Sequence, residues 1–434
     1  MDNFQSFIDN LQMEIYTNSQ SDVSPKKLKL LFVSTHIFQP TGYAKVTHGI
    51  LAELAKIPWL TVTHYAIQSL GKDISKRTYN PSINVINAAS LEKDPLKSGG
   101  FGIQELPECI VKEKPNIILI YNDILVINKY VDVISKLPGD FKIWTYLDQV
   151  YPNHQKSSID MLNMHIDRIF CFSNAWKNAL LSQGITRPVD VMTHAFCSDI
   201  FIPMSRTLAR QGTNIPDDSF IFLNMNRNQP RKRHDILIMA FVDLIIRHPT
   251  KQIYLMCVCD KGDTGGYNIF DIFARELTLR KVSIDHFSDR LMLTTNAMCY
   301  SDAEVNMFYN MSNCGVSCAD GEGFGLCAFE QMGVGIPQVL SNIIGHAEYC
   351  NEKNGILVDP KIRAYIPNCI SPIGGEVSIV DYRDFSKAME AFILDDTLCK
   401  ELGANARSTV MAYTWESSMR TFVSRLQAEF DINN

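Results

Sequence analysis

Two glutamates and three glycines stand close together in the segment from Asp320 to Glu330, which reads DGEGFGLCAFE. Glycine allows the backbone to approach a ligand closely, and the free N–H groups at the start of a following helix attract an anion. Glu322 and Glu330 are eight positions apart, so one lies on the loop and the other within about two turns of that helix. Both carboxylates can then accept hydrogen bonds from sugar hydroxyls in one pocket. The pattern predicts a phosphate or diphosphate site beside a sugar site; the alternative is an ordinary solvated surface loop.

A second candidate is the segment NRNQPRKRH, residues 226–234, which holds four cations within nine positions. Arginine offers a planar fork of donors and lysine a mobile point charge, so the segment can neutralise a departing diphosphate without a metal ion. The chain contains no Asp-x-Asp triplet, the carboxylate pair that usually holds a nucleotide-bound metal. The alternatives are a solvated basic loop and a weak nucleic-acid patch.

Further candidates lie in the first half of the chain. Gly42 follows a turn, and its N–H, with those of the next two residues, opens a predicted helix that could bind the same phosphate; a plain turn glycine is at least as good an interpretation. Asp148 and His154 follow a predicted strand and are candidates for contact with an acceptor. A lone histidine is more often structural than catalytic, so no histidine receives a catalytic role.

The glycine spacing argues against a dinucleotide-binding oxidoreductase. Gly321, Gly323 and Gly325 give G-x-G-x-G rather than G-x-G-x-x-G. They also occur late in their half of the chain rather than after its first strand.

Composition bounds the class of protein. The chain has 434 residues, 46% of them hydrophobic and 20% charged, which is typical of a soluble globular protein with two or three domains. A net charge of −6 gives no overall cationic field for nucleic acid. The 12 cysteines are scattered, lack zinc spacing and follow no signal peptide, which favours reduced thiols, a cytoplasmic location and no metal site. The longest apolar stretch, residues 117–127, is too short and too interrupted to span a membrane, although peripheral membrane contact stays open.

Short apolar runs alternate with helical patterns along the chain, which predicts parallel sheets covered on both faces. A polar leader, residues 1–26, precedes this pattern, and the stretch 203–219, with two prolines and a glycine, interrupts it. We therefore predict a first domain over 27–205, a second over 206–412, and a closing helical segment over 413–434. The predicted strands are 28–34, 60–65, 83–87, 116–121, 141–147 and 168–173, then 220–225, 252–259, 289–293, 314–318 and 338–340; the predicted helices are 43–56, 174–183, 234–247, 267–280, 302–311, 326–333 and 398–426.

These motifs together resemble the retaining glycosyltransferases of family 4, also called glycosyl transferases group 1, which have the α/β GT-B fold. The run from Glu322 to Glu330 is similar to that family's E-x7-E signature, and Arg227 and Lys232 match its R-x4-K pair. The likeness continues through GIPQVLS at 335–341, NGILVDP at 354–360 and HAFCSDIFIP at 194–203. It covers most of residues 28–426 and is denser in the second half.

The resemblance implies two Rossmann-like domains facing a central cleft, with the helix that begins near Trp415 packing back on the first. It further implies transfer of a sugar from a nucleoside-diphosphate sugar to a glycan, lipid or protein acceptor, with retention and without metal or cofactor. By the same resemblance Arg227 and Lys232 would bind the diphosphate, Glu330 the ribose, and residues near Asn296 the base. The donor sugar and phosphate would contact Glu322, Gly323, Phe324, Gly325 and Leu326.

The chain departs from the family pattern at three positions. Cys327 replaces a common proline, Gln331 a common alanine, and a single Gly42 a common glycine pair, while residues 367–380 look like an insertion. Two alternatives to a transferase therefore stay open: a catalytically silent GT-B protein that binds nucleotide sugars or serves as a scaffold, and a GT-B nucleotide-sugar epimerase.

Overall fold

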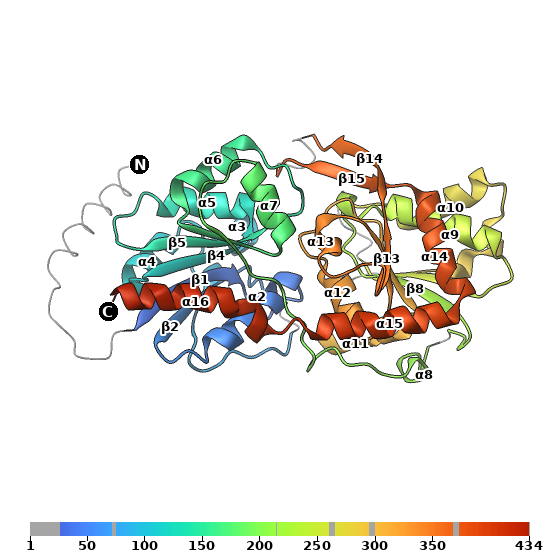
Figure 1. The fold of residues 1–434 in the computed structure, drawn as a ribbon, viewed down its shortest axis with the longest axis horizontal. Coiled ribbons are helices and arrows are strands. Elements are labelled where there is room, and N and C mark those ends of the chain that lie inside the picture. Colours follow the sequence, from blue (N-terminus) through green and yellow to red (C-terminus); the bar gives the residue numbers. More distant parts are fainter. Residues whose placement is uncertain are drawn as a thin grey trace. The chain divides into compact units, whose positions relative to one another are not determined.

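The computed structural model describes residues 27–71, 75–213, 215–259, 265–294, 300–367 and 373–433. The chain forms two units (Figure 1). Unit 1 contains the described parts of Met1–Gln149, His154–Thr193 and Trp415–Asn434, and unit 2 contains Val150–Asn153 and His194–Thr414.

Unit 1 is a parallel sheet of seven strands in the order β3-β2-β1-β4-β5-β6-β7. β1, with the sequence LKLLFVST, is buried at seven of its eight positions because strands pair with it on both edges and helices cover both faces. The strands are β1 (Leu28–Thr35), β2 (Leu60–Ile67), β3 (Asn84–Asn87), β4 (Ile117–Asp123), β5 (Lys142–Asp148), β6 (Arg168–Cys171) and β7 (Val189–Val191). The helices are α2 (Gly42–Leu54), η1 (Ala88–Ser90), α3 (Pro95–Ser98), α4 (Leu106–Glu113), α5 (Ile124–Ile134), α6 (Lys156–His165), α7 (Asn174–Ser182) and α16 (Trp415–Asn433).

Unit 2 repeats this topology in a parallel sheet of six strands, β10-β9-β8-β11-β12-β13, with a separate antiparallel pair, β14-β15. Phe222, Leu255 and Val316 on the strands pack with Leu237 and Phe241 on α9 in one core cluster. The strands are β8 (Phe220–Asn224), β9 (Ile253–Cys257), β10 (Leu291–Leu293), β11 (Cys314–Ser317), β12 (Gln338–Ser341), β13 (Gly355–Val358), β14 (Pro360–Tyr365) and β15 (Glu376–Val380). The helices are α8 (Arg206–Ala209), η2 (Pro230–Lys232), α9 (His234–Arg247), α10 (Ile269–Leu279), η3 (Ile284–His286), η4 (Ser288–Arg290), α11 (Asp302–Met311), α12 (Leu326–Gly333), α13 (Ile344–Ala347), α14 (Tyr382–Leu394) and α15 (Asp396–Met411).

The prediction of one terminal helix over 398–426 is wrong, because the chain forms two helices, α15 and α16. The main-chain carbonyl of Tyr413, between them, accepts a hydrogen bond from the Phe196 N–H at 2.9 Å instead of continuing the helical pattern. α15 belongs to unit 2 and α16 to unit 1. In unit 1, the ring of Phe422 on α16 lies 5.0 Å from that of Phe170 and 5.9 Å from that of Trp144.

The passage from unit 1 to unit 2 falls after Thr193, twelve residues before the predicted limit at 205. Pro203, at the start of the predicted linker, lies in a segment held on α11: Asn306 and Asn310 accept the main-chain N–H groups of Ile202 and Met204. Four residues from within the first half, Val150–Asn153, are also part of unit 2.

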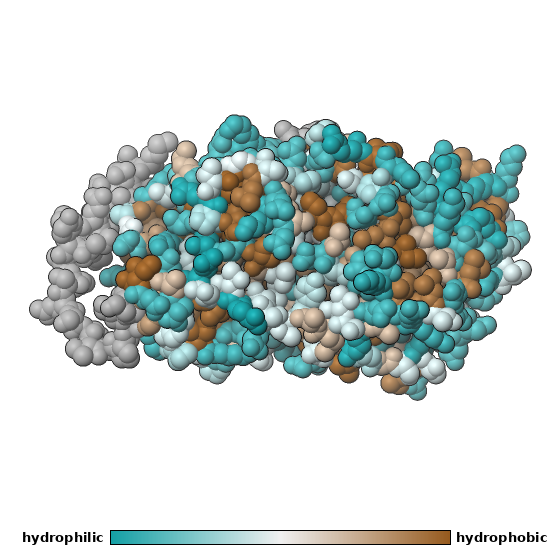
Figure 2. Space-filling view, viewed as in Figure 1, coloured by the Kyte–Doolittle hydropathy of each residue, from teal (hydrophilic) through white to brown (hydrophobic). Residues whose placement is uncertain are grey.

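The visible face of the molecule is mainly hydrophilic, with hydrophobic side chains gathered in the region of β13 in unit 2 (Figure 2). A groove there is lined by Ile356 and Leu357 of β13 and by Leu398 and Leu402 of α15. Among the described helices, none has both the length and the apolar character that crossing a membrane requires.

Candidate functional site

The two charged segments singled out in the sequence follow neighbouring strands of unit 2. β8 and β11 pair in parallel although two strands separate them in the sequence, so the strand order reverses between them. Ligands of open α/β sheets bind at the carboxyl ends of strands where this reversal occurs. The basic loop, residues 225–233, follows β8, and the glycine loop, residues 318–325, follows β11. The topology therefore brings the two loops to one place.

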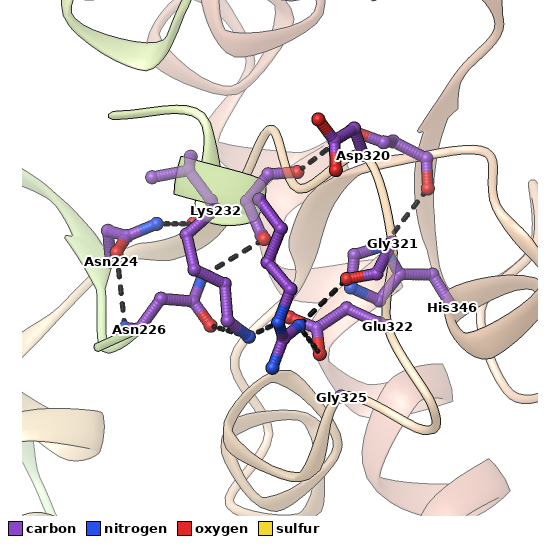
Figure 3. Close-up of polar contacts among 12 residues, drawn as sticks. Asn224, Asn226, Lys232, Asp320, Gly321, Glu322, Gly325 and His346 are labelled. Carbon is purple, nitrogen blue, oxygen red and sulfur yellow. Dashed lines mark hydrogen bonds and ion pairs between the residues drawn. The ribbon is translucent and has the colours of Figure 1, made fainter. Parts of the chain in front are cut away.

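An ion pair joins these loops (Figure 3). Lys232 Nζ of the basic loop contacts Glu322 Oε1 of the glycine loop, and Lys232 also donates to Asn226 Oδ1 at 3.1 Å. Arg231 Nη1 donates to Glu322 Oε2 at 3.0 Å and to the Gly321 carbonyl at 2.8 Å. Glu322 and Lys232 are 6% and 7% exposed. One buried carboxylate thus orients two cations.

The charge states of the pair follow from burial and from each other. Burial alone would raise the pKa of the Glu322 carboxyl, but the charges of Lys232 and Arg231 outweigh it and lower that pKa to about 2. Burial, followed by repulsion from Arg231, lowers the pKa of Lys232 to about 8, although Glu322 acts in the opposite direction. At neutral pH the site is a carboxylate facing two cations.

The conformation of the basic loop is set by asparagines. Asn224, at the end of β8, donates to the Val316 carbonyl on β11 at 2.8 Å, and Asn226 donates to the Ser317 hydroxyl at 3.0 Å. The Asn228 side chain exchanges two hydrogen bonds of 2.8 Å with the main chain of Tyr267. These bonds hold the first half of the loop against its neighbours, and Asn226 also accepts a hydrogen bond from Lys232.

The glycine loop requires its glycines where other groups approach it. Gly325 has φ of +87°, and its carbonyl accepts from the Tyr349 hydroxyl at 2.9 Å. A Cβ at position 345 would lie 2.3 Å from the Glu322 carbonyl oxygen. His346 Nδ1 donates to the Ser341 carbonyl at 3.0 Å, and burial lowers the pKa of this imidazole. A small cavity between these residues is lined by Asn226, Glu322, Gly325, Cys327 and His346.

Glu330 and Gln331 lie side by side on α12 and are both buried. Glu330 accepts a hydrogen bond from the Tyr309 hydroxyl at 2.8 Å. Gln331 donates to the Ser312 hydroxyl at 2.7 Å and accepts from the Gln338 amide at 3.1 Å. A Cβ on Gly315 would lie 2.1 Å from the side-chain oxygens of Gln331 and Gln338. The absence of a side chain at Gly315 therefore leaves space for these two glutamines. The glutamine in place of the common alanine is therefore part of the packing.

The side chain of Phe324, a predicted donor contact, is buried among aromatic rings. Its ring is 3% exposed and lies 4.8 Å from the His194 ring, 4.9 Å from Phe329 and 5.2 Å from Tyr349. Burial lowers the pKa of His194 to about 3, so this imidazole is neutral. The side chain of Phe324 thus anchors the glycine loop in an aromatic cluster.

Arg227 is exposed, and its guanidinium has no ion pair with any residue in the described part of the chain. The cation next to Lys232 that contacts Glu322 is instead Arg231, which sequence analysis did not single out. The sequence analysis also did not single out Asn226, Asp320 or His346. Arg231 stands one residue before Lys232, and position alone does not tell which of four neighbouring cations turns inward.

Three further residues that the sequence predicts to be functional, Gly42, Asp148 and His154, belong to unit 1. Gly42 opens α2, whose Ala44 N–H donates to the Thr41 hydroxyl at 3.3 Å, so that N–H already has an acceptor. Asp148 ends β5 and accepts from the Tyr43 hydroxyl at 2.5 Å. His154 is buried, both its ring nitrogens lack a hydrogen-bond partner among the described residues, and burial lowers its pKa to about 4.

Asn296, predicted to lie near the base, is outside the described residues. No group of three or more His, Cys, Asp or Glu residues within the described ranges could hold a metal ion.

Residues 205–366, which contain both loops, match the family described as glycosyl transferases group 1. The resemblance stated from the motifs is thus confirmed. Curated relatives include D-inositol 3-phosphate glycosyltransferases from Streptosporangium roseum, 23% identical over 53% of this chain and 47% of that protein, and from Catenulispora acidiphila, 28% identical over 37% and 36%. The matched part of this chain spans about half the length of the first relative and about a third of the length of the second.

Solved structures share the architecture of the whole described chain. Sucrose-phosphate synthase from Thermosynechococcus elongatus is 15% identical, with a TM-score of 0.68 over 94% of this chain and 100% of that one. Anabaena HepE, solved in complex with UDP-glucose, is 13% identical, with a TM-score of 0.65 over 92% and 100%. At such identities the likeness bears on the fold alone. Two parallel α/β units with this topology form the GT-B fold, as predicted.

Proposed function

We propose that the protein transfers a sugar from a nucleoside-diphosphate sugar to a glycan, lipid or protein acceptor, with retention of anomeric configuration and without a metal ion. The observation that carries the proposal is the meeting of Lys232, Arg231 and Glu322 at the carboxyl ends of β8 and β11. The family match supports it, because residues 205–366 include all three.

The leaving diphosphate is the centre of the proposed mechanism. Negative charge builds on its phosphate oxygen as the glycosidic bond breaks, so cations already held in place lower the barrier. Lys232 uses two N–H groups for Glu322 and Asn226, and the third has no acceptor among the described residues. Arg227, exposed on the same loop, supplies a second positive charge, and the N-terminus of α12 supplies main-chain N–H groups.

In this scheme no enzyme nucleophile is required, and retention follows from attack by the acceptor on the face of the sugar from which the diphosphate departs. The departing phosphate oxygen accepts the proton of the acceptor hydroxyl, and the new bond forms on the face from which the phosphate leaves. Glu322 then acts by orienting the cations and by accepting from the donor sugar, while Glu330 accepts from the ribose. Asp148, whose carboxylate is held by Tyr43, is the acceptor-side candidate with an ordered partner.

A donor screen tests the proposal directly. The purified protein is incubated with UDP-, GDP- and ADP-sugars with and without EDTA, and sugar release or transfer is followed by NMR. We expect one donor to be consumed at equal rates in both conditions and the product to keep the donor's anomeric configuration. UDP-glucose comes first because HepE, which shares the fold, binds it. Nucleotide binding without any sugar release would indicate a silent protein, and an isomeric nucleotide sugar an epimerase.

Glu330→Ala tests the site once a donor is known. Loss of the proposed ribose contact should raise the donor KM or abolish turnover. Exposed Glu401, changed to alanine, is the matched control and should leave kcat/KM within about twofold. A Glu330→Ala protein with the wild-type kcat/KM would show that Glu330 does not hold the donor.

A further inference from the structure

Asp320 lies between the two loops of the donor site, although neither the motif nor the proposed mechanism uses it. Its Oδ1 accepts from the Tyr151 hydroxyl at 3.2 Å, and its Oδ2 lies 3.6 Å from Arg233 Nη1. Its own N–H donates to the Arg231 carbonyl at 2.9 Å (Figure 3 shows Asp320 beside Gly321 and Glu322). The side chain and main chain of Asp320 thus hold the residues on either side of Lys232.

Tyr151, which contacts Asp320, comes from the first half of the chain. It belongs to the short segment Val150–Asn153, which is part of unit 2 although the chain before and after it belongs to unit 1. The ring is 3% exposed. A Cβ on Gly321 would lie 2.3 Å from its Cε1, and a Cβ on Gly375 would lie 2.9 Å from its Cγ. Two glycines therefore make room for this one ring.

The second of these glycines belongs to the segment 367–380, which looked like an insertion without a role. Gly375 directly precedes β15, and its carbonyl accepts the Ile366 N–H at 3.2 Å, so the β14-β15 pair holds it in place. Gly375 therefore lies close to the Cγ and Cδ2 atoms of Tyr151, and Gly321 of the glycine loop lies close to Cε1 and Cδ1. This arrangement fixes the hydroxyl in the direction of Asp320.

We propose that Tyr151 and Asp320 are positioning residues of the donor site: their hydrogen bond, together with Arg233, keeps the glycine loop and the basic loop in the conformation that binds the diphosphate. The proposal rests on the proposed function. Asp320 stands two residues before Glu322, and Arg231 bridges the carbonyl of Gly321 and the carboxylate of Glu322. A change at Asp320 is therefore transmitted to Arg231 and to Glu322, which contacts Lys232.

The charge on Asp320 gives this arrangement a pH dependence. Burial raises the pKa of Asp320 to about 6, against the opposing effects of Arg233, Tyr151 and Arg231. Arg233 also faces Asp235 and Tyr267, and Tyr151 also faces Glu322. Below pH 6 a protonated Asp320 no longer pairs with Arg233, so the two loops lose this connection and nucleotide binding weakens.

The test measures binding rather than turnover, so it needs no acceptor. The full chain and the variants Asp320→Asn and Tyr151→Phe are titrated by calorimetry with the tightest binder among UDP, GDP and ADP from pH 5 to 8. Because the phosphates themselves titrate, the quantity compared is the ratio of variant Kd to wild-type Kd at each pH. Tyr365→Phe, an exposed tyrosine on β14, is the control.

We expect Tyr151→Phe to raise Kd roughly fivefold at pH 7.5, because it loses a hydrogen bond to a charged group, and Asp320→Asn at least as much, because it loses the charge that faces Arg233. The ratio for Asp320→Asn should fall toward one below pH 6, where the wild-type residue is itself neutral. Ratios near one at every pH, or a lower melting temperature with an unchanged Kd, would overturn the proposal. If Asp320→Asn fails to fold, Tyr151→Phe decides the matter, because it keeps the ring between the two glycines. A wild-type protein that binds none of the three nucleotides would instead overturn the proposed function, and this proposal with it.

Discussion

Lys232 and Glu322, ninety residues apart in the sequence, form a buried ion pair that connects the loop after β8 with the loop after β11. Each is less than a tenth exposed, and Arg231 contacts the second oxygen of the same carboxylate. Because one residue of the pair lies on each loop, the pair links the conformations of the two loops. The donor site is therefore built by an interaction that is also part of the protein's stability.

Glu322→Gln should lower the free energy of unfolding by roughly 3 kcal/mol at pH 7, since it leaves two cations facing a neutral group in a buried place. Urea denaturation followed by circular dichroism measures the change. Exposed Glu401→Gln is the control and should stay within about 0.5 kcal/mol. Equal stability of Glu322→Gln and the wild type would mean that the pair contributes nothing.

The contribution of Glu322 to the unfolding free energy should depend on pH, and the same variant measures this dependence. The pKa of Glu322 is lowered from its unfolded value of 4.5 to about 2, so its contribution is present above pH 4.5 and is lost as the pH falls toward 2. The difference in unfolding free energy between wild type and Glu322→Gln should shrink over that window. Taking the difference removes the contribution of Asp320, whose raised pKa acts in the opposite direction. A difference that stays constant from pH 7 to pH 3 would contradict the prediction.

Lys232 should limit activity on the alkaline side. Its pKa is lowered to about 8, so the free enzyme loses this cation above that pH and binds the diphosphate less well. The donor kcat/KM should fall by about tenfold per pH unit well above pH 8. Lys232→Arg keeps the charge and should move this limb upward. A profile of the same shape in both proteins would assign the limb to another group.

Arg227 and Lys232 should behave differently although both match one motif. Lys232→Met removes a buried ion-pair partner and should reduce both donor binding and stability. Arg227→Gln changes an exposed side chain and should reduce donor affinity while leaving the unfolding free energy within about 0.5 kcal/mol. Calorimetry and urea denaturation on the same preparations separate the two effects. Loss of stability in Arg227→Gln would indicate a structural role that its exposure does not suggest.

Gln331→Ala introduces the residue that is common in the family and should nevertheless lower the stability of the protein. It removes one of the two acceptors of the Gln338 amide, which keeps the Ile336 carbonyl, and the donor to the Ser312 hydroxyl, in a buried place beside a new cavity. We expect a loss of roughly 2 kcal/mol in unfolding free energy with little change in kcat/KM. Exposed Gln211→Ala is the control. A variant as stable as the wild type would mean that the neighbouring glycine, Gly315, collapses into the space.

The sequence by itself determined the order of the elements. Helices α9, α11 and α12 begin and end at the predicted residues, because each has a strong apolar period and clear limits. It also identified both loops of the site, since glycines and clustered cations at strand ends are local features. The single helix predicted over 398–426 failed because its break depends on a hydrogen bond to Phe196, more than two hundred positions away.

Only the tertiary structure decided which side chains of the two loops meet. The cations of residues 226–234 are alike in sequence, but the turn at η2 and the left-handed conformation of Arg233 direct Arg231 and Lys232 toward Glu322 and leave Arg227 exposed. The contact of Tyr151 with Asp320 was likewise invisible, because it joins a segment of the first half to unit 2. Spacing along the chain tells which residues share a loop, whereas the direction of a side chain depends on backbone dihedrals and on partners that are distant in sequence.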